Sequence, residues 1–212
     1  MSQVAISGNA SGTGTLTIAS PNTNSNYTLT LPEATTTIVG TNATQTLTNK
    51  TIQGGAITSG TAVASTSGTS IDFTSIPSWV KRITVMFSGV STNGTSNLQI
   101  QLGDSGGVET SGYASVLGAI VGANSCGIAS QTSGHLLSAN VTAATTQSGM
   151  VIFANLSSNN WLAIQISARS DGISTNTTTT KSLSDTLDRV RITTVNGTDT
   201  FDAGSVNIMY EG

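Results

Sequence analysis

The alternation in Leu98-Gln99-Ile100-Gln101-Leu102 decides the fold class of this chain. Apolar side chains occupy every second position, and amide side chains lie between them. Side chains of a β-strand point alternately to opposite faces, so this pattern predicts a strand with one face in a core. Ile83, Val85 and Phe87 repeat the pattern upstream, and Asn93-Gly94 between the two segments predicts a hairpin turn.

Further strand candidates follow along the chain, separated by turn residues such as Asn159-Asn160, Asp171-Gly172 and Asn196-Gly197. They are residues 115–121, 135–141, 150–154, 161–168, 189–195 and 205–210. Many short strands with frequent turns are typical of two packed sheets. The sequence therefore predicts an all-β fold in which residues 71–212 form an antiparallel β-sandwich of jelly-roll type.

The composition supports β-structure and argues against helices and disorder. The 212 residues include 30 Ser, 37 Thr and 23 Gly, and only 8% are charged. Thr, Ser and Gly are poor residues for helix interiors, whereas Thr, Val and Ile fit the pleated surface of a sheet. Disordered chains usually combine high charge with few β-branched residues, which is the opposite of this composition.

Several partners and cofactors are disfavoured by what the sequence lacks. The net charge is −3 and no basic run occurs, so we expect no nucleic-acid binding. The longest run of apolar residues and glycine, Val116 to Ala123, is too short for a membrane-spanning helix, and residues 1–20 carry no recognisable export signal. With one cysteine, Cys126, and one histidine, His135, we expect neither an internal disulfide nor a structural metal, and we expect no cofactor.

The N-terminal region, residues 1–40, contains three short alternating segments, 15–18, 27–31 and 37–39. Three such strands bury too little surface to be stable alone, so we expect other copies of the chain to stabilise them. Residues 41–70 are rich in Thr, Gly, Ser and Ala, which is typical of a flexible linker. Spaced Leu and Ile residues within this segment favour a neck that is ordered in an assembly.

A long uncharged stretch distinguishes the C-terminal domain. From Thr110 to Ala168 no Asp, Glu, Lys or Arg occurs. Monomeric sheets normally carry charges that keep their exposed positions soluble. The stretch therefore indicates contact with another subunit, although solvation of the outer face by Ser, Thr, Asn and Gln alone is the alternative.

Residues that suggest catalysis have simpler structural explanations. Gly103-Asp104-Ser105-Gly106-Gly107 matches the segment around the serine of chymotrypsin-like proteases, but the only histidine follows the serine in the chain, so we interpret the segment as a turn. His135 is expected to be structural.

Neither Asp185 with Asp188 nor Asp199 with Asp202 lies in an aromatic-rich or metal-binding pattern, and ion pairs with Arg189 and Arg191 are the expected role of the first pair. Trp79 and Trp161 are sugar-stacking platforms or core anchors, and the core is the favoured interpretation. No catalytic, cofactor-binding or metal-ligating residue is assigned, and the receptor-binding residues are unknown.

Five segments together resemble structural fibre proteins of tailed bacteriophages. Residues 2–10, 28–32 and 46–52 are similar to the N-terminal parts of such proteins, and residues 71–83 and 201–211 resemble the first and last strands of a C-terminal domain that recurs in them. The resemblance spans nearly the whole chain, and the two C-terminal segments are its most specific parts. It implies a homotrimer whose N-terminal region binds other virion proteins of the tail, baseplate or capsid. The sandwich then faces outward from the virion.

Three functions follow from this resemblance. The first is a non-enzymatic virion fibre whose sandwich attaches to a glycan of the host surface. At 212 residues the chain is shorter than typical tail fibres, so a head fibre or capsid decoration protein with a structural role is the alternative. The third, a polysaccharide-degrading enzyme, is disfavoured because neither a long β-helical repeat nor a groove lined by carboxylates is evident.

Overall fold

The computed structural model describes residues 11–14, 17, 22–26, 28, 57–122 and 125–212. The chain divides into two compact units, Met1–Lys50 and Thr51–Gly212. Apart from residues 17 and 28, the strands expected at 15–18, 27–31 and 37–39 lie outside the described residues, as does most of the expected neck. The fold described below is that of the second unit.

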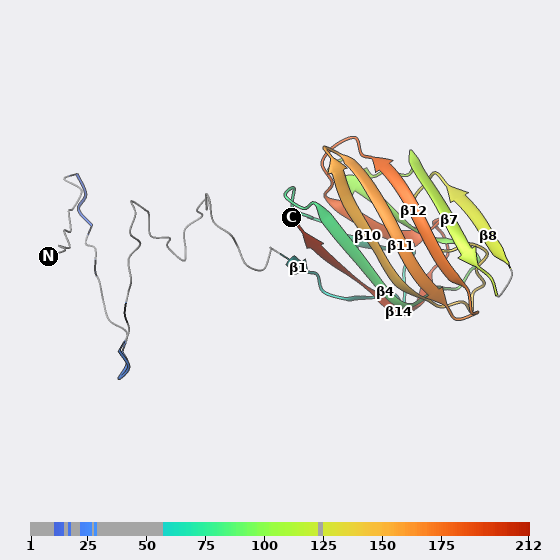
Figure 1. Cartoon of the computed structure of the whole chain (residues 1–212), viewed down its shortest axis with the longest axis horizontal. Helices are drawn as coiled ribbons and strands as arrows, with labels where there is room; N and C mark the ends of the chain where they lie inside the picture. Colours follow the sequence, from blue (N-terminus) through green and yellow to red (C-terminus); the bar gives the residue numbers. More distant parts are fainter. Residues whose placement is uncertain (1–10, 15–16, 18–21, 27, 29–56, 123–124) are drawn as a thin grey trace. The chain divides into compact units, whose positions relative to one another are not determined.

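The second unit is built of strands that form two antiparallel sheets, and its described residues include no helix (Figure 1). The larger, nine-stranded sheet has the order β1-β14-β4-β10-β11-β12-β7-β8, with β2 also paired to β14. The five-stranded sheet has the order β3-β13-β5-β6, with β9 also paired to β5. The strands are β1 (Ile57–Ser59), β2 (Val63–Ala64), β3 (Ser70–Phe73), β4 (Arg82–Thr92), β5 (Leu98–Asp104), β6 (Gly107–Val108), β7 (Tyr113–Ile120), β8 (Cys126–Gln131), β9 (His135–Leu136), β10 (Gln147–Ser157), β11 (Asn160–Arg169), β12 (Ser174–Ser182), β13 (Arg189–Thr194) and β14 (Phe201–Glu211).

A hydrophobic core lies between the two sheets and confirms the predicted all-β sandwich. Ile83, Val85 and Phe87 of β4 point into it, and so do Ile100 and Leu102 of β5. These are the residues whose alternation predicted the strands. The core also takes Val151 and Phe153 from β10, Val190 and Ile192 from β13, and Val206 and Ile208 from β14.

The sandwich begins before the expected boundary at residue 71. β1 and β2 both pair with β14, so residues 57–64 belong to the larger sheet rather than to a separate neck. The pairs Ile57 with Glu211 and Val63 with Val206 place the start of the described sandwich beside its final strand.

The hairpin predicted at Asn93-Gly94 is wrong, because β4 and β5 belong to different sheets. The chain crosses between the sheets here, next to the loop that crosses back from β13 to β14. The backbone N–H of Asn93 donates to the Thr200 carbonyl at 2.9 Å. The side-chain Oδ1 of Asn93 accepts from the Thr200 N–H, also at 2.9 Å. A side chain at Gly94 would collide with the Asp199 carboxylate, whose Oδ2 lies 2.0 Å from the position of a Cβ. Glycine is therefore needed for the approach of the two crossing loops rather than for a hairpin.

The strand predicted over 135–141 is shorter in the structure, where only His135 and Leu136 are in a strand. The next residues form a buried loop whose backbone is bonded to side chains. The Leu137 carbonyl accepts hydrogen bonds from Gln147 Nε2 at 2.6 Å, Gln165 Nε2 at 3.0 Å and Thr175 Oγ1 at 3.2 Å. Because these side chains satisfy the Leu137 carbonyl, it needs no hydrogen bond from a neighbouring strand.

The sequence patterns missed four strands of the larger sheet, which are β1, β2, β8 and β12. β12 contains Thr177-Thr178-Thr179-Thr180, in which both faces carry the same residue, so no alternation is visible. β8 is the edge strand beside β7 and is mostly small residues. Alternation detects a strand only where its two faces differ in polarity.

Truncation of Phe153 to alanine tests the position of the core. Phe153 is fully buried between the sheets, so Phe153→Ala should lower the free energy of unfolding by about 3–5 kcal/mol. Leu156→Ala, at an exposed position near the end of the same strand, should change it by less than about 0.5 kcal/mol. Equilibrium unfolding in urea measures both values, and equal effects of the two substitutions would contradict the packing described here.

Candidate functional site

His135 is buried and held by a chain of hydroxyl groups. Its Nδ1 lies 2.8 Å from Thr179 Oγ1, and Thr179 donates its own proton to Ser115 Oγ at 2.8 Å. Nδ1 therefore carries the proton and donates to Thr179. The ring makes an edge contact with Phe153, at 5.4 Å between ring centroids. Burial lowers the pKa of His135 to about 3, so the ring is neutral at physiological pH. The prediction that His135 is structural agrees with this environment.

Several buried polar atoms beside this histidine have no hydrogen-bond partner among the described residues. They are His135 Nε2, Gln147 Oε1, Gln165 Oε1, Arg169 Nε and Thr177 Oγ1. Gln165 and Thr177 are direct neighbours on β11 and β12. Buried polar atoms normally bond to protein or to ordered water.

The protease-like segment forms a tight turn between β5 and β6. Asp104 accepts hydrogen bonds from the Ser184 hydroxyl at 2.7 Å and from the Gly106 N–H at 2.8 Å. These bonds hold the pKa of Asp104 below its ordinary value. His135 is bonded to Thr179, and Asp104 is bonded to Ser184 and Gly106, so these residues do not form a catalytic triad with Ser105.

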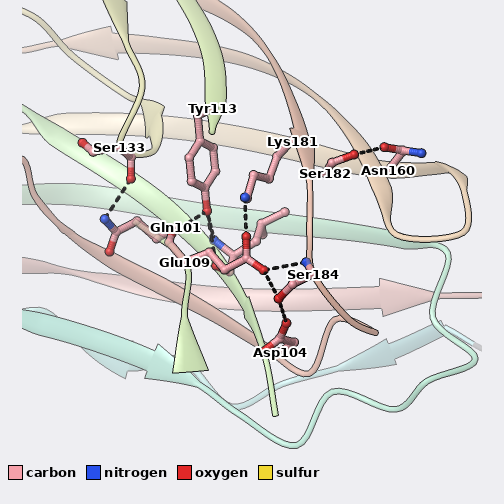
Figure 2. Close-up of polar contacts among 10 residues, drawn as sticks. Gln101, Asp104, Glu109, Tyr113, Ser133, Asn160, Lys181, Ser182 and Ser184 are labelled. Carbon is pink, nitrogen blue, oxygen red and sulfur yellow. Dashed lines mark hydrogen bonds and ion pairs between the residues drawn. The ribbon is translucent and has the colours of Figure 1, made fainter. Parts of the chain in front are cut away.

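A polar cluster ties the end of β12 to the loop that follows β6 (Figure 2). Lys181 pairs with Glu109, and its Nζ lies 5.1 Å from the centroid of the Tyr113 ring. Partial burial raises the pKa of Glu109. The hydrogen bond from Lys181 and the two from Ser184 lower it by more, so the pKa of Glu109 lies below its ordinary value. Burial raises the pKa of Tyr113. All of these groups are already paired, so the cluster joins the two sheets and leaves no free acid or base.

The remaining carboxylates form structural contacts. Asp188 pairs with Arg189 at 2.7 Å, as the sequence predicted, but Arg191 pairs with Asp72 of β3, also at 2.7 Å. Asp199 accepts from the Ser96 N–H at 2.9 Å, and Asp202 accepts from Ser91. The described residues contain no group of three or more His, Cys, Asp or Glu side chains that could hold a metal ion. They also contain no helix that is long and apolar enough to span a membrane.

The two tryptophans have different environments. Trp161 is in the core, as predicted. The same prediction for Trp79 is wrong, because 44% of Trp79 is exposed. Its ring lies against Tyr210 of β14, with 5.9 Å between centroids and 55° between ring planes. Trp79 follows Pro77-Ser78 in a loop before β4, so no strand directs its ring inward.

A small polar hollow lies next to the Trp79 loop. It has a volume of about 120 Å³, and its polar lining includes Ser78, Asn155, Ser158 and Asn159. The Asn155 N–H donates to the Lys81 carbonyl at 2.8 Å, which holds the β10–β11 turn beside this loop. Hydroxyl and amide groups are suited to bond the hydroxyls of a sugar, and the exposed ring of Trp79, which belongs to the neighbouring loop but does not line the hollow, is an apolar platform for a sugar C–H face.

A larger polar hollow of about 300 Å³ lies on the five-stranded sheet. Its lining includes Gln99, Gln101 and Arg191, but these side chains are largely committed to protein. Gln101 Nε2 donates to the Ser133 carbonyl at 2.9 Å, and Arg191 is paired with Asp72. Asn155 Nδ2 in the smaller hollow is also committed, to the Ser158 carbonyl at 2.8 Å, so the Trp79 loop is the better candidate for ligand binding only because it presents an exposed aromatic ring.

Comparison with known proteins found no matching family model, curated protein or solved structure.

The pH dependence of folding tests the environment of His135. In the unfolded chain a histidine has a pKa of about 6.5, so lowering the pH from 7 to 5 protonates the unfolded state but not the folded state. The free energy of unfolding should therefore fall by about 2 kcal/mol between pH 7 and pH 5. His135→Gln should show almost no change over the same range, because the chain has no other histidine. A wild-type protein with a flat profile in urea unfolding would contradict the buried neutral ring.

Proposed function

We propose that this chain is a non-enzymatic subunit of a bacteriophage virion fibre. Its N-terminal region anchors it to the particle, and its β-sandwich binds a glycan on the host surface. The chains form homotrimers in the host cytoplasm and remain part of the virion. The resemblance of the segments named above supports the virion class, and the all-β sandwich is compatible with it.

The observation that carries the attachment role is the exposed Trp79 beside a polar hollow. Trp79 is half-exposed on a loop, and its ring is tilted against Tyr210 and presents an apolar surface. Ser78 and the amides of Asn155 and Asn159 lie at the adjacent hollow. Three such sites in a homotrimer strengthen weak individual binding through their effective concentration.

The absence of an enzyme activity is supported by the state of the polar side chains. Asp104 and Glu109 both have lowered pKa values and are bonded to Ser184, so neither is a general acid at neutral pH. His135 is buried and neutral. Asp104 and His135 are two of the residues whose types suggested catalysis in the sequence.

Binding of purified bacterial surface polysaccharides tests the attachment role. The probes are lipopolysaccharide O-chains, capsular polysaccharides and wall teichoic acids, titrated against the full chain while tryptophan fluorescence is recorded. We expect saturable binding of at least one probe. Trp79→Ala should weaken this binding by about tenfold or more, which corresponds to about 1.4 kcal/mol.

Val195→Ala is the matched control, because Val195 is an exposed apolar residue directly after β13 of the five-stranded sheet. It should leave the affinity unchanged. If no probe binds, attachment through a glycan is wrong and the capsid decoration role is favoured. If Trp79→Ala and Val195→Ala bind equally well, attachment stands but the Trp79 loop is not its site.

A further inference from the structure

The outward face of the larger sheet carries an unusual set of exposed aliphatic side chains. Ile164 and Ile166 of β11 are 61% and 65% exposed, and Ile128 of β8 is 80% exposed. The same face includes Val116, Ile120, Met150 and Leu162. We call these seven residues the aliphatic face. Contiguous apolar patches of this kind mark sites of interaction on soluble proteins.

The strand register makes these side chains one surface. Met150 lies opposite Ile166, and Ile164 lies opposite Thr178, which in turn lies opposite Val116. Ile128 lies opposite Gly118, whose missing side chain leaves the isoleucine prominent. The face thus extends over β10, β11, β12, β7 and β8, which lie side by side in Figure 1.

Charge is absent from this face, although charged residues occur on its strands. Arg169 of β11 and Lys181 of β12 both point inward, where their side chains are 1% and 5% exposed. Inward positions of the same strands also carry Gln165, Thr175 and Thr177. From Ile164 to Arg169, β11 has polar residues inside and aliphatic residues outside, which is the reverse of a sheet whose outer face meets water, whereas both faces of β12 are polar.

The projected area of the aliphatic face is about half of what each partner buries in a standard protein–protein contact. Five neighbouring strands span about 19 Å across the sheet, and the seven residues of β11 from Leu162 to Ala168 span about 20 Å. Standing side chains make the accessible area larger than this projection of roughly 400 Å². A standard interface buries about 800 Å² on each partner.

We infer that the aliphatic face is the surface through which copies of this chain contact one another. The inference rests on the homotrimer of the proposed function and assigns it a surface. A partner must be uncharged and aliphatic over the same area, because a charged partner would lose its hydration without gaining an ion pair. The same face of another copy meets this requirement, and three copies can turn this face toward a common three-fold axis.

Two further features of the face favour contact between copies. A shallow hollow of about 350 Å³ is lined by Met150, Ile152, Ile164 and Ile166 together with Asn176 and Thr178, and it can receive an aliphatic side chain from a neighbour. The sheet ends at β8, whose outer edge has no partner strand among the described residues. β8 contains neither charge nor proline, the residues by which monomeric proteins protect such an edge.

Charge substitutions on the aliphatic face test the inference. Light scattering of the full chain should give a trimer for the wild type and a monomer for Ile164→Lys and Leu162→Lys. The control is Val195→Lys, because Val195 is 40% exposed, as Leu162 is 43% exposed, but follows β13 of the other sheet. Val195→Lys should remain a trimer.

The thiol of Cys126 gives a second measurement that does not depend on the variants. Cys126 lies opposite Ile120 at the margin of the aliphatic face and is exposed in the single chain. In the wild-type trimer a water-soluble maleimide should modify it at least about tenfold more slowly than in Ile164→Lys. If the variants do not fold, the comparison is made with wild type diluted until it dissociates.

The outcomes separate the inference from the proposed function. If the wild type is a trimer and the variants remain trimers with equally reactive Cys126, the aliphatic face is not the contact and the homotrimer stands. If the wild type is a monomer at all concentrations, the inference and the homotrimer are both wrong, while glycan binding at Trp79 is decided by its own titration.

Discussion

The inner face of a nine-stranded sheet is wider than the area that a five-stranded sheet can cover, and the sandwich must cover the remainder by other means. Here a short strand, β9, and the loop after it lie against the uncovered part. A loop in this position exposes backbone carbonyls to the interior, and these must be bonded. Gln147, Gln165 and Thr175 bond to the Leu137 carbonyl, and Arg169 bonds to those of Ala139 and Asn140.

This requirement explains why the polarity of the sheet reverses along its width. Where β5 and β13 cover β4 and β10, the inward residues are apolar, as in Val85 and Val151. Where the loop covers β11 and β12, the inward residues are donors of hydrogen bonds. The aliphatic residues Leu162, Ile164 and Ile166 of β11 are on the outside, and the free energy of burying them is not used by the single chain. In the proposed homotrimer that free energy becomes available for assembly.

The sequence predicted the fold class and the core strands because one sheet face is apolar there and the other is not. It failed where both faces are alike, as in the threonines of β12, and where side chains replace a strand partner, as after His135. The hairpin prediction failed because Asn93-Gly94 also fits a crossing between sheets, and local turn chemistry does not distinguish the two. Trp79 was placed in the core on size alone, and no local pattern reveals that its loop leaves it exposed. The uncharged stretch from Thr110 to Ala168 did indicate an unusual surface, but only the register shows which residues face outward.

The position of β14 has a consequence for how the protein is made. This strand lies between β1 and β4 and pairs with both, so strands synthesised near the start of the sandwich acquire their neighbour only after residues 201–211 have been translated. Contacts of such long sequence separation make folding slow. A nascent chain that stops before β14 leaves the edges of β1 and β4 open on the ribosome. Completion of the sandwich therefore requires residues 201–211, and in the proposed virion fibre only chains that contain β14 present the folded surfaces used in assembly.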